Sequence, residues 1–199
     1  MTTSDQVYIE AILNGETNAF SFLVDRYKDL VFSLALGMMK HREEAEEVAQ
    51  DTFVKAFKSL GKFKGDSKFS TWIYRVAYNT CLDRLKKNKR QQSTVEINAY
   101  TANQLGTLES ALDHLEKKEQ ETTIQECLSK LPSKDSFILT LFYFEELSLE
   151  EISEIVGLKT NHVKVKLFRS RKKLATILMT YLDHEIIESY AGKNRTAFR

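Results

Sequence analysis

Seven lysine and arginine residues, with no acid among them, lie between Lys159 and Lys173. Clustered cations of this kind are what binding to nucleic-acid phosphates requires. If the segment is helical, Val163, Leu167 and Leu174 face a protein core while the cations project elsewhere. Such a helix fits the major groove of DNA, with its first residues at base edges and later cations on phosphates. A solvated helical face is the alternative meaning of the same charge run.

A second cluster interleaves aromatic rings with cations. The rings are Phe63, Phe69, Trp72, Tyr74 and Tyr78, and the cations are Lys62, Lys64, Lys68, Arg75 and Arg84. Rings stack on unpaired bases and cations hold the strand, so the combination suits single-stranded nucleic acid. Taken singly, each ring is better explained as part of a core, because aromatic residues at helical spacing are normally buried.

Charge is segregated along the chain, although the net charge is only +1. Five acids lie between Glu43 and Asp51, and five cations lie between Arg84 and Arg90. The physics alone favours a solvated face for the acidic segment, with a favourable first-turn charge against the helix dipole.

Catalytic chemistry has no support in the sequence. There is no glycine-rich phosphate loop and no nucleophile motif, and the four histidines are scattered: His41, His114, His162 and His184. Cys81 and Cys127 offer neither metal spacing nor a disulfide framework. We therefore expect no enzyme activity, no cofactor and no metal site.

The cations and rings must be positioned by helices. Apolar residues recur at helical spacing over 20–34 and 48–57, and a third helix runs from Phe69 to about Lys87 after the loop segment GKFKGDSKFS. These three helices could close one domain. The polar stretch 91–107 has no periodicity and is interpreted as the start of a linker.

The second half of the chain has a different helical pattern. An amphipathic segment covers 108–128, Pro132 separates it from an apolar helix near 137–144, and Ser148 with Glu151 forms a capping box. Gly157 ends that short helix, and the basic helix begins near Thr160. A short helix, a glycine turn and a basic helix are typical of a helix-turn-helix.

The chain length and composition are consistent with this organisation. The 199 residues suffice for two small cores, and no apolar run approaches the roughly 20 residues that cross a bilayer. The amino terminus lacks a basic region followed by an apolar stretch, so we expect a soluble, cytoplasmic protein. The predicted fold is all-α, with two small helical domains joined by a flexible linker.

Three ordered segments resemble the conserved domains of sigma-70 family factors, in the extracytoplasmic-function group: REEAEEVAQDTFVKAF, KFKGDSKFSTWIYRVAYNTCLDRLKK and LPSKDSFILTLFYFEELSLEEISEIVGLKTNHVKVKLFRSRKKL. The resemblance covers about residues 16–90 and 120–175. It implies a sigma-2 domain (16–90), a linker (91–119), a sigma-4 helix-turn-helix domain (120–178) and a tail (179–199). The tail has no counterpart in the family pattern, which leaves a disordered end and a regulatory contact as alternatives.

The resemblance also implies partners and site residues in the first domain. The family binds core RNA polymerase through the clamp helices of its largest subunit and through its flap, and anti-sigma proteins commonly inhibit it. The positions matching the clamp contacts are Glu47, Gln50 and Asp51. The positions matching capture of a flipped base of the minus-10 element, which holds the strand open without ATP, are Asp66, Ser67, Lys68, Phe69, Trp72, Asn79 and Arg84.

The helix after Gly157 resembles the segment that recognises the minus-35 element. The matching positions are Thr160, Asn161, His162, Lys164, Lys166, Phe168 and Arg169. Family members usually carry a small hydroxyl residue where Val165 stands and smaller residues than Asn161 and His162, so the family's promoter consensus should not be transferred.

The linker is long enough for two DNA sites. Promoter elements about one and a half turns apart lie roughly 50 Å apart, and about 30 residues from Arg90 onward can extend to roughly 100 Å. The main rival hypothesis is a two-module DNA-binding regulator that never contacts polymerase, for which Gln50 and Asp51 would be dispensable. An adaptor that binds a partner helix is a further rival, for which the basic helix would be dispensable.

Overall fold

The computed structural model describes the backbone of residues 4–91 and 117–196 and the side chains of residues 5–89 and 123–181. Helices joined by short turns and loops make up this described part, and no strand occurs in it. The all-α prediction is therefore confirmed. Residues 92–116 of the predicted linker lie outside the described residues.

Four helices form the first domain: α1 (Ser4–Leu13), α2 (Phe20–Met39), α3 (Arg42–Ser59) and α4 (Phe69–Gln91). Their core is apolar and fully buried, with Leu23, Val31, Leu34, Val48 and Ile73 at its centre. Helix α1 is additional to the helices expected from the sequence. Asp5 anchors it to α2, because its carboxylate forms an ion pair with Arg26 and accepts a 2.8 Å hydrogen bond from the Tyr27 hydroxyl.

The second domain also has four helices: α6 (Lys117–Lys130), α7 (Ser133–Tyr143), α8 (Leu149–Val156) and α9 (Thr160–Thr196). Pro132 lies immediately before α7, as predicted. The core of the second domain includes Phe137, Leu141, Ile152 and Val163. The backbone of α9 continues to Thr196, so most of the predicted tail belongs to this helix.

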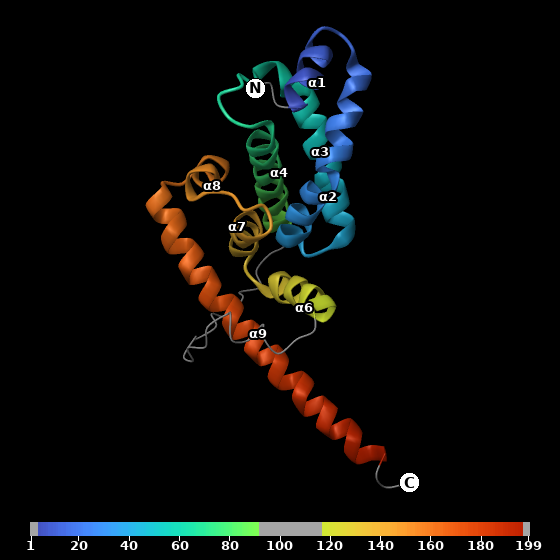
Figure 1. The fold of residues 1–199 in the computed structure, drawn as a ribbon, viewed down its shortest axis with the longest axis vertical. Coiled ribbons are helices and arrows are strands. Elements are labelled where there is room, and N and C mark those ends of the chain that lie inside the picture. Colours follow the sequence, from blue (N-terminus) through green and yellow to red (C-terminus); the bar gives the residue numbers. More distant parts are fainter. Residues whose placement is uncertain (1–3, 92–116, 197–199) are drawn as a thin grey trace.

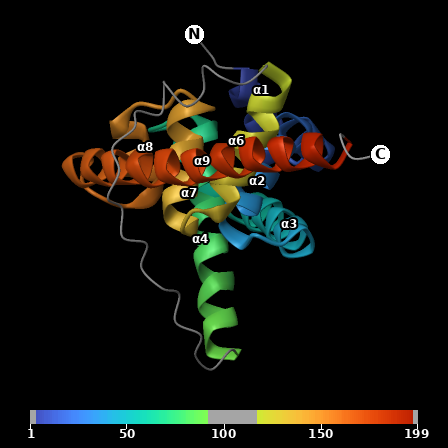
Figure 2. The same ribbon diagram turned by 90° about the horizontal axis from the view of Figure 1, so that it is seen from below.

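The two domains pack against each other and share one continuous hydrophobic core. Helix α8 lies against α4, while α6 and α7 lie against α2 (Figure 1). Helix α9 crosses below α6 and α7, and its C-terminal half projects away from the bundle (Figures 1 and 2). In Figure 2 the end of α4 projects from the bundle toward the bottom of the view, in a different direction from α9.

Candidate nucleic-acid interface

Helices α8 and α9 form the predicted helix-turn-helix. At the start of α8 the Glu151 amide donates to Ser148 Oγ (3.1 Å) and the Ser148 amide donates to Glu151 Oε2 (3.0 Å), which confirms the capping box. Gly157 ends α8 with φ +67°, a left-handed conformation that glycine adopts without strain. Only Leu158 and Lys159 separate it from α9, so the turn fixes where the basic helix starts.

Helix α9 has one face inside its domain and one face in solvent. The buried face contains Val163, Leu167, Ser170 and Leu174. The opposite face contains exposed residues at i, i+4, i+7 and i+11, and Arg169 lies beside them. We call these exposed residues the outward stripe: Asn161, Val165, Phe168, Arg169 and Lys172. Of the other predicted minus-35 residues, His162 and Lys164 are exposed and Thr160 is half-buried.

Side chains on the flanks of α9 bind the protein itself. Asp135, at the start of α7 and with its side chain only 5% exposed, accepts hydrogen bonds from Lys166 Nζ (2.8 Å) and Lys173 Nζ (2.6 Å). Burial raises the pKa of Asp135, but the two lysines more than offset that, so the pKa lies below its ordinary value. Lys166, a predicted minus-35 residue, therefore holds α9 to α7. On the other flank, the Arg171 guanidinium lies 5.0 Å from the Phe142 ring centroid.

The loop before α4 places its predicted base-capture residues in two different environments. Phe69 is 4% exposed, and its ring packs against Tyr27, Phe63 and Trp72 with centroids 5.5 to 5.7 Å apart. Its side chain belongs to the core and is not free to stack on a base. Trp72 is half-buried, whereas Asp66, Lys68 and Asn79 are exposed and Ser67 is partly exposed. A base could reach this exposed group, with Trp72 as the adjacent ring.

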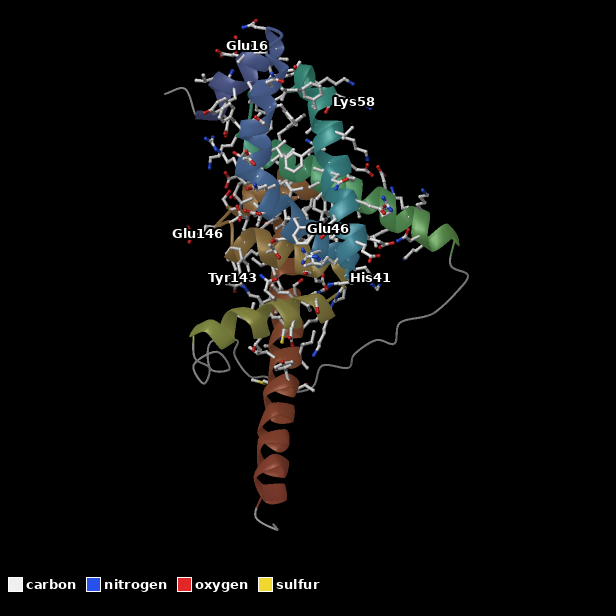
Figure 3. All side chains as sticks on the ribbon, turned by 90° about the vertical axis from the view of Figure 1, so that its right-hand side faces the viewer. Glu16, His41, Glu46, Lys58, Tyr143 and Glu146 are labelled. Atoms are coloured by element: carbon white, nitrogen blue, oxygen red, sulfur yellow. The ribbon has the colours of Figure 1, made fainter. Side chains whose placement is uncertain are left out.

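The outer surface of α3 displays the predicted polymerase contacts. Glu47, Gln50 and Asp51 are all exposed, and Glu46 and Lys58, labelled in Figure 3, mark the same helix. Arg84 from α4 donates to Glu47 Oε2 at 2.8 Å and lies 3.7 Å from an Asp51 oxygen. Arg84, predicted to contact the minus-10 strand, is thus an ion-pair partner of the acidic face.

An apolar groove adjoins this acidic face on α3. Val54 lies one turn beyond Gln50 and Phe57 lies two turns beyond it, and both are exposed. Phe20 and Phe53 also line the groove. A charged edge beside exposed aromatic and aliphatic side chains is the arrangement found at protein–protein interfaces.

Comparisons with known proteins match both halves of the chain. A family model described as sigma-70 region 2 matches residues 23–91, and one described as sigma-70, region 4 matches residues 121–174. The ECF RNA polymerase sigma factor SigW of Bacillus subtilis is 35% identical over 83% of this chain and 92% of its own. The RNA polymerase sigma-H factor of Pseudomonas aeruginosa is 32% identical over 89% of this chain and 95% of its own.

The chain belongs to the sigma-70 family, in the ECF group. Two solved structures have the same fold. CnrH, solved in complex with the cytosolic domain of CnrY, has a TM-score of 0.61 at 23% identity and covers 89% of this chain and 99% of its own. RpoE of Bartonella quintana, solved with the anti-sigma factor NepR, has a TM-score of 0.61 at 19% identity, covering 80% and 96%.

In this sigma factor the two domains meet at the candidate DNA-binding elements. Lys68 Nζ, in the loop before α4, forms a 2.9 Å ion pair with Glu151 of α8. The Tyr74 hydroxyl of α4 donates to Glu145 Oε2 at 3.0 Å. The hydrogen bond from Lys68 lowers the pKa of Glu151, whereas burial raises that of Glu145. The second domain therefore contacts the predicted minus-10 surface at Lys68, whose side chain stays 68% exposed.

Packing between the domains is incomplete on the α2 side. Ser133 Oγ donates to the Met38 carbonyl at 2.6 Å and Lys40 Nζ donates to the Leu128 carbonyl at 3.1 Å. Between these helices remains a pocket of about 580 Å³ that is partly open to solvent, and buried Ser136 Oγ, which lines it, has no hydrogen-bond partner. A buried hydroxyl without a partner weakens an interface, so this contact is suited to separation.

Several contacts of these sites leave no signal in the local sequence. Asp135 and its partner Lys166 are 31 positions apart, and Tyr74 and Glu145 are 71 apart, so no local pattern links them. Val165 differs, because its position out of phase with the buried Val163 and Leu167 already indicates an exposed side chain. Among the described residues, no group of three or more His, Cys, Asp or Glu could hold a metal, and no helix is long and apolar enough to span a membrane.

Proposed function

We propose that this ECF sigma factor binds core RNA polymerase and directs promoter-specific initiation of transcription. In this proposal α9 recognises the minus-35 element in the major groove. The loop before α4, with Trp72 and Asn79, captures an unpaired base of the minus-10 element and stabilises the open strand. The observation that carries the proposal is the outward stripe of α9, a solvent-exposed cationic helix face fixed by a capped helix and a glycine turn.

The polymerase contact is proposed for α3. Glu47, Gln50 and Asp51 supply exposed polar groups, and Val54 with Phe57 supply the apolar surface that such an interface buries at its centre. Arg84 holds the two carboxylates in place from α4. We assign Arg84 to the orientation of this face as well as to the neighbouring DNA strand.

The compact arrangement must open for both promoter elements to be bound at once. Glu151 contacts the minus-10 loop, and the path from Glu151 along α8 to Asn161 spans at most about 25 Å. Elements about one and a half DNA turns apart are separated by roughly 50 Å. We propose that polymerase binding separates the domains, and that an anti-sigma protein, such as the NepR bound to RpoE in its solved complex, can hold the factor inactive.

Run-off transcription tests the proposal. Purified core polymerase is incubated with fragments of the source genome, with and without this chain. We expect chain-dependent transcripts that start at a fixed distance from a shared pair of short motifs. If the chain bound DNA but never directed a start, a regulator that does not contact polymerase would replace the proposal.

A double variant, Gln50→Ala with Asp51→Ala, tests the role of α3. Truncation of a residue that contributes to an interface costs more than about 1 kcal/mol, so we expect loss of both side chains to weaken binding to core polymerase tenfold or more and to abolish the run-off transcripts. Binding of the chain to duplex DNA should remain. Glu10→Gln, an exposed acid on α1, is the matched control. Equal transcription by the double variant and the control would contradict the polymerase contact.

A further inference from the structure

The outward stripe of α9 contains two apolar side chains surrounded by cations. Val165 is 48% exposed and Phe168 is 57% exposed. Among the residues of α9 whose side chains the structure describes, they are the only large hydrophobic ones on the exposed surface. Lys164, Arg169 and Lys172 flank them, and Lys172 Nζ lies 4.8 Å from the Phe168 ring centroid.

Neither apolar residue supports the fold of this domain. Val165 lies opposite the buried Val163 and Leu167, and Phe168 lies one turn beyond Val165. Their flanking cations are not needed for packing either, because the ion pairs that hold α9 in place use Lys166 and Lys173. The stripe is therefore free to meet a ligand along its whole length.

The ligand chemistry follows from the mixture of charge and apolar surface. Cations bind phosphates, but a valine or phenylalanine adds nothing to phosphate binding. On the major-groove edges of base pairs, the apolar group is the C5 methyl of thymine, which apolar side chains contact. A helix with cations around two apolar side chains is complementary to a groove that presents thymine methyls between its phosphates.

We propose that Val165 and Phe168 contact thymine C5 methyl groups and thereby set the minus-35 specificity of this sigma factor. Residues three apart on a helix have Cβ atoms about 5 to 6 Å apart, and stacked bases rise about 3.4 Å. The two methyls therefore lie one or two base steps apart. The inference rests on the proposed function, because it takes α9 as the helix that enters the groove.

The test removes single methyl groups from the DNA. A pool of duplex promoters randomised in the minus-35 element is first selected with the holoenzyme, and each selected thymine is then replaced by deoxyuridine, which lacks only the C5 methyl. Burial of one methyl corresponds to about a fourfold change in affinity. We expect deoxyuridine to weaken binding of the holoenzyme about fourfold at each of two nearby positions. At the other positions it should have no effect on binding.

Variants of the chain assign the effect to these side chains. Val165→Ala should bind thymine and uracil equally at one position, and Phe168→Ala should do so at the other. Lys164→Ala, a matched variant of an exposed cation on the same helix, should weaken binding to both DNAs by the same factor and keep the discrimination. Because all three side chains are exposed, these variants should fold normally.

Two results would overturn the inference: equal binding of thymine and uracil promoters by the unaltered chain, or undiminished discrimination in both apolar variants. Failure of the proposed function is distinguishable, because no chain-dependent transcript would then arise from any template. If transcripts arise but the methyl groups have no effect, only the assignment of Val165 and Phe168 falls.

Discussion

Asp135 shows how a single buried charge can orient a surface helix. Its carboxylate lies inside the second domain and draws two lysines of α9 onto α7. Removal of a buried hydrogen-bonding partner costs about 1 to 3 kcal/mol, and here both ammonium groups can still reach water. We expect Asp135→Asn to lower the free energy of unfolding by an amount within that range, measured by urea denaturation at pH 7.

The same residue predicts a pH dependence. The hydrogen bonds from Lys166 and Lys173 outweigh burial and keep the pKa of Asp135 below its ordinary value. Its contribution to stability is therefore complete above the unfolded-state pKa of about 3.9 and is lost as the pH falls through the lower folded-state pKa. The difference between Asp135→Asn and the unaltered chain should shrink in acid. Glu154→Gln, at an exposed acid of α8, should change stability by less than about 0.5 kcal/mol at any pH.

At the scale of elements, the turn between α8 and α9 depends on the backbone of one residue. A Cβ atom at Gly157 would meet nothing within 4 Å, yet φ is +67°, so any cost of a side chain comes from the backbone. We expect Gly157→Ala to destabilise the protein by about 1 kcal/mol, observed as a lower urea midpoint. Gly157→Asn is the control, and it should lose less stability because asparagine tolerates this conformation. Equal losses would contradict a purely conformational cost.

Elements with strong local signals could be predicted from the sequence. The capping box at Ser148, the stop at Gly157 and the apolar spacing of the helices within 20–57 are all encoded within a few residues, and the structure has them where they were expected. Helix α1 was missed because its stability depends on Asp5 reaching Arg26 and Tyr27 in α2. Phe69 is placed in the base-capture segment by the family resemblance, but three aromatic rings bury its side chain, in line with the core position that its helical spacing favours.

At the scale of the whole molecule, the sequence predicted two domains but not their contact. The side chains that join the domains, such as Ser133 with Met38 and Lys68 with Glu151, are 95 and 83 positions apart. Pairing over such distances depends on how complete surfaces fit together, which no local pattern records. The interface nevertheless bears on what the free factor can bind, because it includes Lys68 of the loop before α4.

Lys40 makes this interface sensitive to pH. Its ammonium donates to the Leu128 carbonyl across the domains, and burial lowers the pKa of Lys40 to about 8. When the domains separate, the side chain returns to water, where its pKa is about 10.4. The open form thus binds more protons between these values, and linkage requires the compact form to gain stability as the pH rises from about 8 to 10. We expect intramolecular energy transfer between dyes on the two domains to increase over this range.

Matched glutamine variants separate this titration from others in the protein. Lys40→Gln can still donate a hydrogen bond to Leu128 but cannot titrate, so its compactness should not change between pH 8 and 10. Lys58→Gln, at an exposed lysine of α3 (Figure 3), should keep the response of the unaltered chain. A response that persists in Lys40→Gln would show that another group controls closure. Loss of the response in Lys40→Gln alone would place the proton-linked contact between the end of α2 and Leu128 of α6.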